Sequence, residues 1–141
     1  MTRIDFYIIP QDQPEQILIF ACKLAEKAFK LDHKITIKVD TEAQATDLDR
    51  LLWEFRPESF IPHVKENDTE DAPVRIVWDK LGNDYEVLIN LSSEVPSEFT
   101  RFQRVTQIAS QHETQRAKSR EHYKFYKERG YPLHNHDLRN R

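Results

Sequence analysis

The chain has 141 residues, of which 38% are hydrophobic and 32% charged, with one cysteine and two glycines. This length suits one domain, and the lone Cys22 excludes an intrachain disulfide and a four-cysteine zinc site. No apolar run approaches the roughly 20 residues of a membrane span, and the N-terminal segment lacks the apolar core of a signal peptide. We therefore expect a soluble cytoplasmic protein that makes no membrane contact.

The net charge of −3 is the sum of two unlike parts. Residues 1–100 carry 11 basic and 20 acidic side chains, which gives −9, and residues 101–141 carry 10 basic and 4 acidic ones, which gives +6. A basic end on an acidic body indicates recognition of an acidic partner. The glycines, Gly82 and Gly130, lie far apart, so the chain lacks a glycine-rich phosphate-binding loop, which argues against a nucleotide enzyme.

The N-terminal apolar pattern alternates between the strand and helix periods. Residues 4–9 predict a buried strand, and residues 15–30 predict a helix with Asp12 as its cap and Pro14 in its first turn. Residues 35–39 predict a second strand. Strand, helix and strand in this order favour a right-handed βαβ unit in which the two strands pair in parallel.

A second helix begins at Asp40 or Thr41, where Thr41 and Gln44 fit a capping box. Its apolar stripe excludes Trp53, and a short extended segment bounded by prolines follows at 58–64. The next predicted elements are a solvated acidic loop at 65–72 and strands at 74–78 and 85–91.

The C-terminal part predicts a short helix at 96–102, and residues 104–109 fit either a strand or a continuation of that helix. A long helix at 112–129 ends at Gly130, and residues 133–141 form a polar, flexible tail. We thus expect a single three-layer α/β domain over 1–132, with a mostly parallel central sheet and helices on both faces.

Three cations of the last helix, Arg116, Arg120 and Lys124, are spaced i, i+4, i+8 and share one face. Two interpretations stay open: an ordinary solvated helix face, or a groove for an acidic peptide or nucleic acid, which arginine suits through its planar fork of donors. The neighbouring aromatics, Tyr123, Phe125 and Tyr126, favour inward packing over stacking on a single strand.

Trp53, Phe60 and Ile61 indicate either a corner of the core or an aromatic surface that binds another protein. Cys22 fits a small buried residue better than a nucleophile. His134, His136 and Asp137 resemble part of a metal site, but we expect no metal because ordered ligands are too few.

Residues 51–63, LLWEFRPESFIPH, resemble a signature of the chi subunit of bacterial DNA polymerase III holoenzyme. Order and spacing also agree at DFYI (5–8), APVRI (72–76), YKFY (123–126) and Gly130-Tyr131. The resemblance implies a nucleotide-binding-like topology without a nucleotide or other cofactor. It also implies a non-catalytic subunit of the clamp-loader complex, which acts in DNA replication.

The resemblance further implies two protein partners and no direct DNA contact. The psi subunit would bind Trp53, Phe60 and the adjacent Ile61, and the acidic, phenylalanine-terminated tail of single-stranded DNA-binding protein would bind Arg116, Arg120, Lys124 and Ala109. The expected assembly is a monomer or a 1:1 heterodimer with psi. The alternatives are an α/β nucleotide-binding enzyme and a direct binder of single-stranded DNA.

Overall fold

The strands form one parallel sheet. In the structure, a computed structural model that describes residues 1–140, seven strands lie in the order β3-β4-β2-β5-β6-β1-β7, and all neighbours run parallel. In chain order the elements are β1 (Arg3–Ile8), α1 (Pro14–Lys30), β2 (Ile35–Lys38), α2 (Glu42–Glu54), β3 (His63–Lys65), β4 (Val74–Val77), β5 (Val87–Asn90), a 3₁₀ turn (Phe99–Arg101), β6 (Arg104–Ala109), α3 (Glu113–Glu128) and β7 (Leu133–Asp137).

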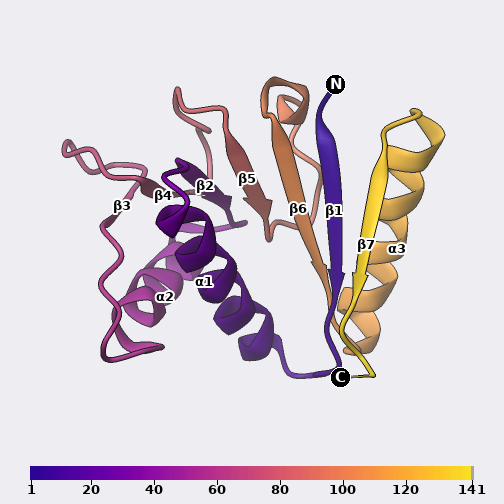
Figure 1. The fold of residues 1–141 in the computed structure, drawn as a ribbon, viewed down its shortest axis with the longest axis horizontal. Helices are drawn as coiled ribbons and strands as arrows, with labels where there is room; N and C mark the ends of the chain where they lie inside the picture. The colour runs from indigo at the N-terminus through magenta and orange to yellow at the C-terminus, as the bar shows by residue number, and fades with distance from the viewer. Residues whose placement is uncertain (141) are drawn as a thin grey trace.

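Helices α1 and α2 cover one face of the sheet and α3 covers the other (Figure 1). One core cluster packs the sheet against α1 and α2 and includes Ile37 and Leu48, both fully buried. The second packs it against α3 and includes Phe6 and Tyr126. These layers confirm the predicted three-layer α/β fold.

The predicted pairing of the first two strands is wrong, because β5 and β6 lie between β1 and β2. All four residues of β5 are buried, so this strand needs a neighbour on each edge and cover on each face. Strand β6 also has a continuous buried run, at 105–108, and pairs with β5. Residues 104–109 therefore form a strand and do not continue the short helix before them, which decides between the two predicted alternatives.

Of the two predicted helix caps, the one of α2 is confirmed and the one of α1 is wrong. Thr41 caps α2, as predicted: its side chain accepts the Gln44 N–H at 3.2 Å. The Gln44 side chain reaches back to the N–H of Asp40 at 2.8 Å, one residue before the Thr41 N–H that a capping box uses. The α1 cap is Gln13 and not Asp12, and the Gln13 side chain makes no capping bond. Pro14 is the first helical residue and forces the residue before it into an extended conformation, which places the cap at Gln13.

The predicted flexible tail is wrong for residues 133–137, which form β7 beside β1. Three contacts join this polar segment to the sheet. His136 donates a hydrogen bond to the buried Asp5 carboxylate at 2.9 Å and stacks on the Tyr7 ring, with 4.3 Å between ring centroids. Leu133 packs into the α3-side core. The sheet therefore extends beyond residue 132, the predicted end of the domain.

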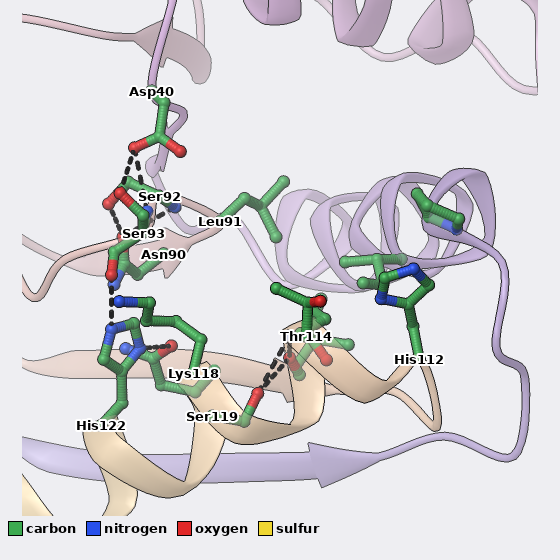
Figure 2. A pocket seen from close by; sticks show the side chains of 15 residues that line it. Asp40, Asn90, Leu91, Ser92, Ser93, His112, Thr114, Lys118, Ser119 and His122 are labelled. Carbon is green, nitrogen blue, oxygen red and sulfur yellow. Dashed lines mark hydrogen bonds between the residues drawn. The ribbon is translucent and has the colours of Figure 1, made fainter.

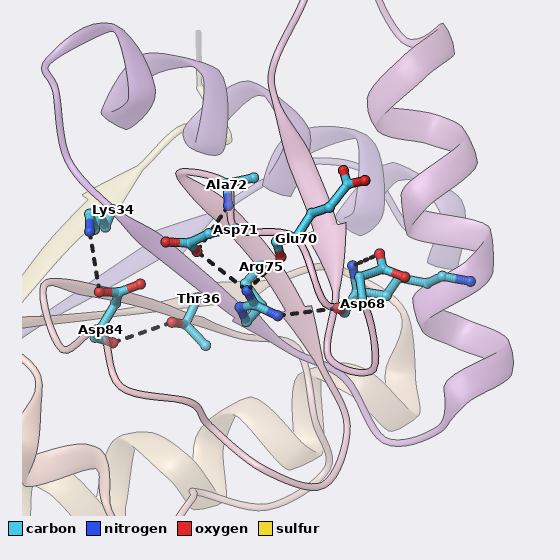
Figure 3. Close-up of polar contacts among 9 residues, drawn as sticks. Lys34, Thr36, Asp68, Glu70, Asp71, Ala72, Arg75 and Asp84 are labelled. Carbon is cyan, nitrogen blue, oxygen red and sulfur yellow. Dashed lines mark hydrogen bonds and ion pairs between the residues drawn. The ribbon is translucent and has the colours of Figure 1, made fainter.

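The acidic loop at 65–72 is mostly exposed, as predicted, but Arg75 of β4 holds it in place (Figure 3). The Arg75 guanidinium donates to the carbonyls of Lys65 and Glu70 at 3.3 and 3.2 Å and to the Asp71 carboxylate at 3.3 Å. One cation thus ties several backbone and carboxylate oxygens of the loop to the sheet.

Candidate functional site

A groove lies between α3 and the ends of β6, β1 and β7, with a volume of about 420 Å³. We call it the α3 groove. Its lining residues are Phe6, Ile8, Ala109, Ser110, Gln111, Arg116, Ser119, Arg120, Tyr123, Asn135, Asp137 and Arg139.

Two of the predicted cations converge in the α3 groove. Arg116 and Arg120 line it and are exposed, and neither forms an ion pair within residues 1–140. Lys124 lies outside the groove lining and pairs with Glu128 at 3.8 Å. The groove therefore presents two guanidinium forks free to bind carboxylates, and the predicted row of cations is shorter than its spacing suggests.

The floor of the α3 groove is apolar. Ile8 and Ala109 are register neighbours on β1 and β6, and both line the groove beside Phe6 and Tyr123. Ala109, predicted as the apolar pocket residue, is thus placed beside Arg116 and Arg120. Cations above an apolar floor suit a ligand that carries both carboxylates and a hydrophobic side chain.

Hydrogen bonds fix α3 over the end of β6. The Gln115 amide donates to the Ile108 carbonyl at 2.7 Å and to the Ser119 hydroxyl at 2.9 Å, and its oxygen accepts the Ser110 N–H at 2.7 Å. About two turns after Ser119, Tyr126 is fully buried. This network sets the rotation of α3, so that Arg116 and Arg120, which directly follow Gln115 and Ser119, line the groove together with Ser119.

The structure adds a wall that the sequence did not indicate. Strand β7 brings Asn135 and Asp137 to the groove, and the turn that follows it brings Arg139. Asparagine and aspartate are depleted in strands, so the composition of this segment masks the strand.

A second exposed feature lies at the opposite edge of the sheet, beside edge strand β3. Trp53 and Phe60 are 50% and 64% exposed, and their ring centroids lie 5.4 Å apart. We call this pair the Trp53/Phe60 surface. Trp53 also packs on His63 of β3, with 4.6 Å between centroids. Ile61 is only 1% exposed and belongs to the core, so its predicted direct contact with a partner is not available in this structure.

Polar contacts to buried residues hold the loop that carries Phe60. The carboxylate of Glu26, a buried residue of α1, accepts a hydrogen bond from Ser59 and pairs with Arg56 at 3.3 Å. His63 lies within hydrogen-bond distance of the carbonyls of Ile61 and Asp49, at 2.7 and 3.2 Å. These contacts preform the surface and give His63 a structural role.

A cavity of about 300 Å³ lies at the carboxyl ends of β5 and β6, next to α3 (Figure 2). His122 lines it at one end, with ring nitrogens 3.3 Å from the Gln107 side-chain oxygen and 3.0 Å from the Ser93 carbonyl. Asp40 accepts the Ser93 N–H at 2.9 Å. Burial lowers the pKa of His122. These polar groups bond to one another and leave few partners for a ligand.

The remaining candidates for chemistry or binding, which are Cys22, the possible metal ligands and the aromatic residues of α3, do not form a site. Cys22 is fully buried, and burial raises the pKa of its thiol to about 12, which disfavours the reactive thiolate. Among residues 1–140, no cluster of histidine, cysteine and carboxylate side chains is arranged so that it could hold a metal ion. Tyr126 is buried, and Arg129 covers the ring of Phe125 at 3.7 Å, so α3 offers little free aromatic surface for base stacking.

Comparisons with known proteins agree over almost the whole chain. A family model described as DNA polymerase III chi subunit, HolC, matches residues 1–134. The chain is 40% identical over 139 residues to DNA polymerase III subunit chi of Pseudomonas aeruginosa, which covers 98% of both chains. The chain belongs to the chi-subunit family of DNA polymerase III.

Proteins of the same name from Haemophilus influenzae and Escherichia coli K12 are each 28% identical to it. The first match spans 132 residues (91% of this chain and 92% of the relative), and the second spans 144 (94% and 96%). Membership makes the chain an accessory component of the bacterial replicative polymerase. The family-model match ends at residue 134, before the groove residues Asn135, Asp137 and Arg139. Within residues 1–140, each helix is too short or too polar to cross a bilayer.

Proposed function

We propose that the chain is a non-catalytic, cytoplasmic adaptor of the clamp-loader complex. Its Trp53/Phe60 surface binds the psi subunit, and its α3 groove binds the acidic tail of single-stranded DNA-binding protein. The two surfaces lie near β3 and β7, the opposite edges of the sheet, which supports simultaneous binding of both partners. DNA is reached only through these proteins.

The α3 groove carries the proposal. Arg116 and Arg120 are free of ion pairs within residues 1–140 and stand beside an apolar floor that includes Ala109. A tail with several aspartates and a terminal phenylalanine offers the complementary set: carboxylates for the guanidinium forks and an aromatic ring for the floor. Charge steers the encounter, and the apolar contact slows dissociation.

The Trp53/Phe60 surface supports the psi contact. Large exposed aromatics are costly in a monomer and are enriched at the centres of interfaces. The rings contact each other, Trp53 also packs on His63, and Ser59 beside Phe60 is bonded to Glu26, so little ordering is needed on binding.

The tail contact is tested by calorimetric titration of a tail peptide into the wild type and Arg120→Ala. We expect a Kd on the order of micromolar for the wild type, and binding at least about tenfold weaker for the variant, since a charge-assisted hydrogen bond is lost. Lys127→Ala is the matched control: it removes one exposed charge of the same helix outside the groove. Equal binding by wild type and Arg120→Ala would exclude this groove.

The cavity in Figure 2 favours one alternative, a nucleotide-binding protein, because open α/β sheets bind ligands at the carboxyl ends of their strands. The chain lacks the glycine-rich loop that such sites use, and His122 and Asp40 are engaged internally. Thermal melting with nucleotides separates the two functions: the adaptor shows no saturable rise in melting temperature.

A further inference from the structure

Asp137 and Arg139 form a tight ion pair within the α3 groove. The Arg139 Nε and one terminal nitrogen donate to the two carboxylate oxygens at 2.9 and 2.6 Å, and the Arg139 backbone N–H donates at 3.0 Å. Hydrogen bonds from Arg139 lower the pKa of Asp137 to about 2, and the carboxylate raises the pKa of Arg139. The pair is therefore ionised throughout the physiological pH range, and Asp137 occupies one edge of the Arg139 fork.

The three arginines of the α3 groove differ in whether they already form an ion pair. Its lining holds Arg116, Arg120 and Arg139 and, within the described residues, a single carboxylate, Asp137, which gives a formal balance of +2. Arg116 and Arg120 are free to bind a ligand, whereas Arg139 is engaged. Asp137 thus weakens the binding of an acidic ligand in two ways. It repels the carboxylates of the ligand, and it pairs with Arg139, the third arginine of the groove.

We propose that Asp137 and Arg139 set the affinity of the α3 groove, with a ligand carboxylate competing against Asp137 for the Arg139 fork. The proposal rests on the function proposed above, since it assumes an acidic peptide in this groove. Both side chains are half exposed, at 41% and 49%, so the fork can turn toward a ligand without exposing a buried charge. Asp137 thereby keeps the binding of the acidic peptide weak enough for bound and free peptide to exchange.

The test is calorimetric titration of the same tail peptide into two variants that each remove one charge of the pair. Asp137→Asn raises the groove charge to +3 and releases Arg139, so we expect about two- to fivefold tighter binding, the range of a solvent-exposed charge pair. Arg139→Gln lowers the groove charge to +1 and leaves Asp137 uncompensated, so binding weakens by a similar factor. Because one attractive charge is gained or lost, salt dependence becomes steeper in the first variant and shallower in the second.

Asp47→Asn is the matched control, because it makes the same change of net charge on the exposed surface of α2, outside the groove. Its affinity should equal that of the wild type. If Asp137→Asn or Arg139→Gln binds like the wild type while Arg120→Ala is weak, the pair has no such role and only this proposal fails. If the wild type and every variant fail to bind, the proposed function fails with it.

Discussion

The indole ring of Trp53 lies against the phenyl ring of Phe60, with 5.4 Å between centroids and an interplanar angle of 45°. Trp53 belongs to the last turn of α2, whereas Phe60 belongs to the following loop, which Ser59 and Arg56 tie to Glu26. The surface is thus built by one helix and by a loop anchored on another. A partner that binds there meets a preformed aromatic pair.

Trp53→Ala and Phe60→Ala should each weaken psi binding by at least about tenfold, because aromatic residues at the centre of an interface carry most of its energy. Binding of the acidic tail peptide should not change, since the α3 groove lies at the other edge of the sheet. Leu31→Ala is the control, because Leu31 is 63% exposed and lies outside this surface. Surface plasmon resonance with immobilised psi measures the effect. Unchanged psi binding by both variants contradicts the assignment, and loss of both ligands indicates unfolding.

Asp5 should make stability depend on pH. Burial alone would raise the pKa of Asp5, but hydrogen bonds from His136 and Arg3, with the charges of Arg3 and Arg104, lower it below the usual 3.8. Because the folded-state pKa is below the unfolded one, the ionised carboxylate stabilises the native state above pH 3.8. This contribution is lost as the pH falls through the folded-state pKa.

We expect Asp5→Asn to lower the free energy of unfolding by about 2 kcal/mol at pH 7, because charge-assisted hydrogen bonds to a buried carboxylate are lost. The difference in the free energy of unfolding between the wild type and the variant should become smaller below pH 3.8. Urea denaturation at pH 7, 5 and 3 measures it, with the exposed Asp47→Asn as control. A difference of the same size at all three pH values would contradict the assignment.

Gly130 ends α3 with φ of 78°, a left-handed conformation that disfavours a Cβ atom. Its N–H donates to the Lys127 carbonyl at 3.0 Å, and the Tyr131 N–H donates to the Tyr126 carbonyl at 3.2 Å, the pattern of a Schellman motif. A Cβ here would meet no atom within 4 Å, so the cost of substitution is conformational alone.

Gly130→Ala should therefore lower the free energy of unfolding by about 1 kcal/mol, and Gly130→Asn by less, since asparagine tolerates this conformation. Thermal or urea denaturation of the two variants measures both values. An alanine variant as stable as the wild type would show that α3 ends differently in solution.

Features specified by neighbours in the chain were predictable. The capping bond from the Gln44 N–H to the Thr41 side chain spans three positions, and Arg116 and Arg120 share a face because they are one helical turn apart. Trp53 was predicted off the apolar stripe of its helix for the same reason. Such signals need no knowledge of the rest of the fold.

Features specified by distant contacts were not predictable. The hydrogen bond between Asp5 and His136 joins residues 131 positions apart, and without it the polar residues 133–137 read as a loose tail. The Asp137/Arg139 pair reaches the α3 groove only through that strand. Strand order is equally non-local, since β1 pairs with β6 rather than with β2.

The adaptor role is tested most directly by asking whether both partners bind at once. The tail peptide is titrated into the chain alone and into the chain saturated with psi. The positions of the α3 groove and the Trp53/Phe60 surface at opposite edges of the sheet predict the same Kd, within about twofold, and a complex of all three components. Loss of peptide binding in the presence of psi would contradict the bridging function.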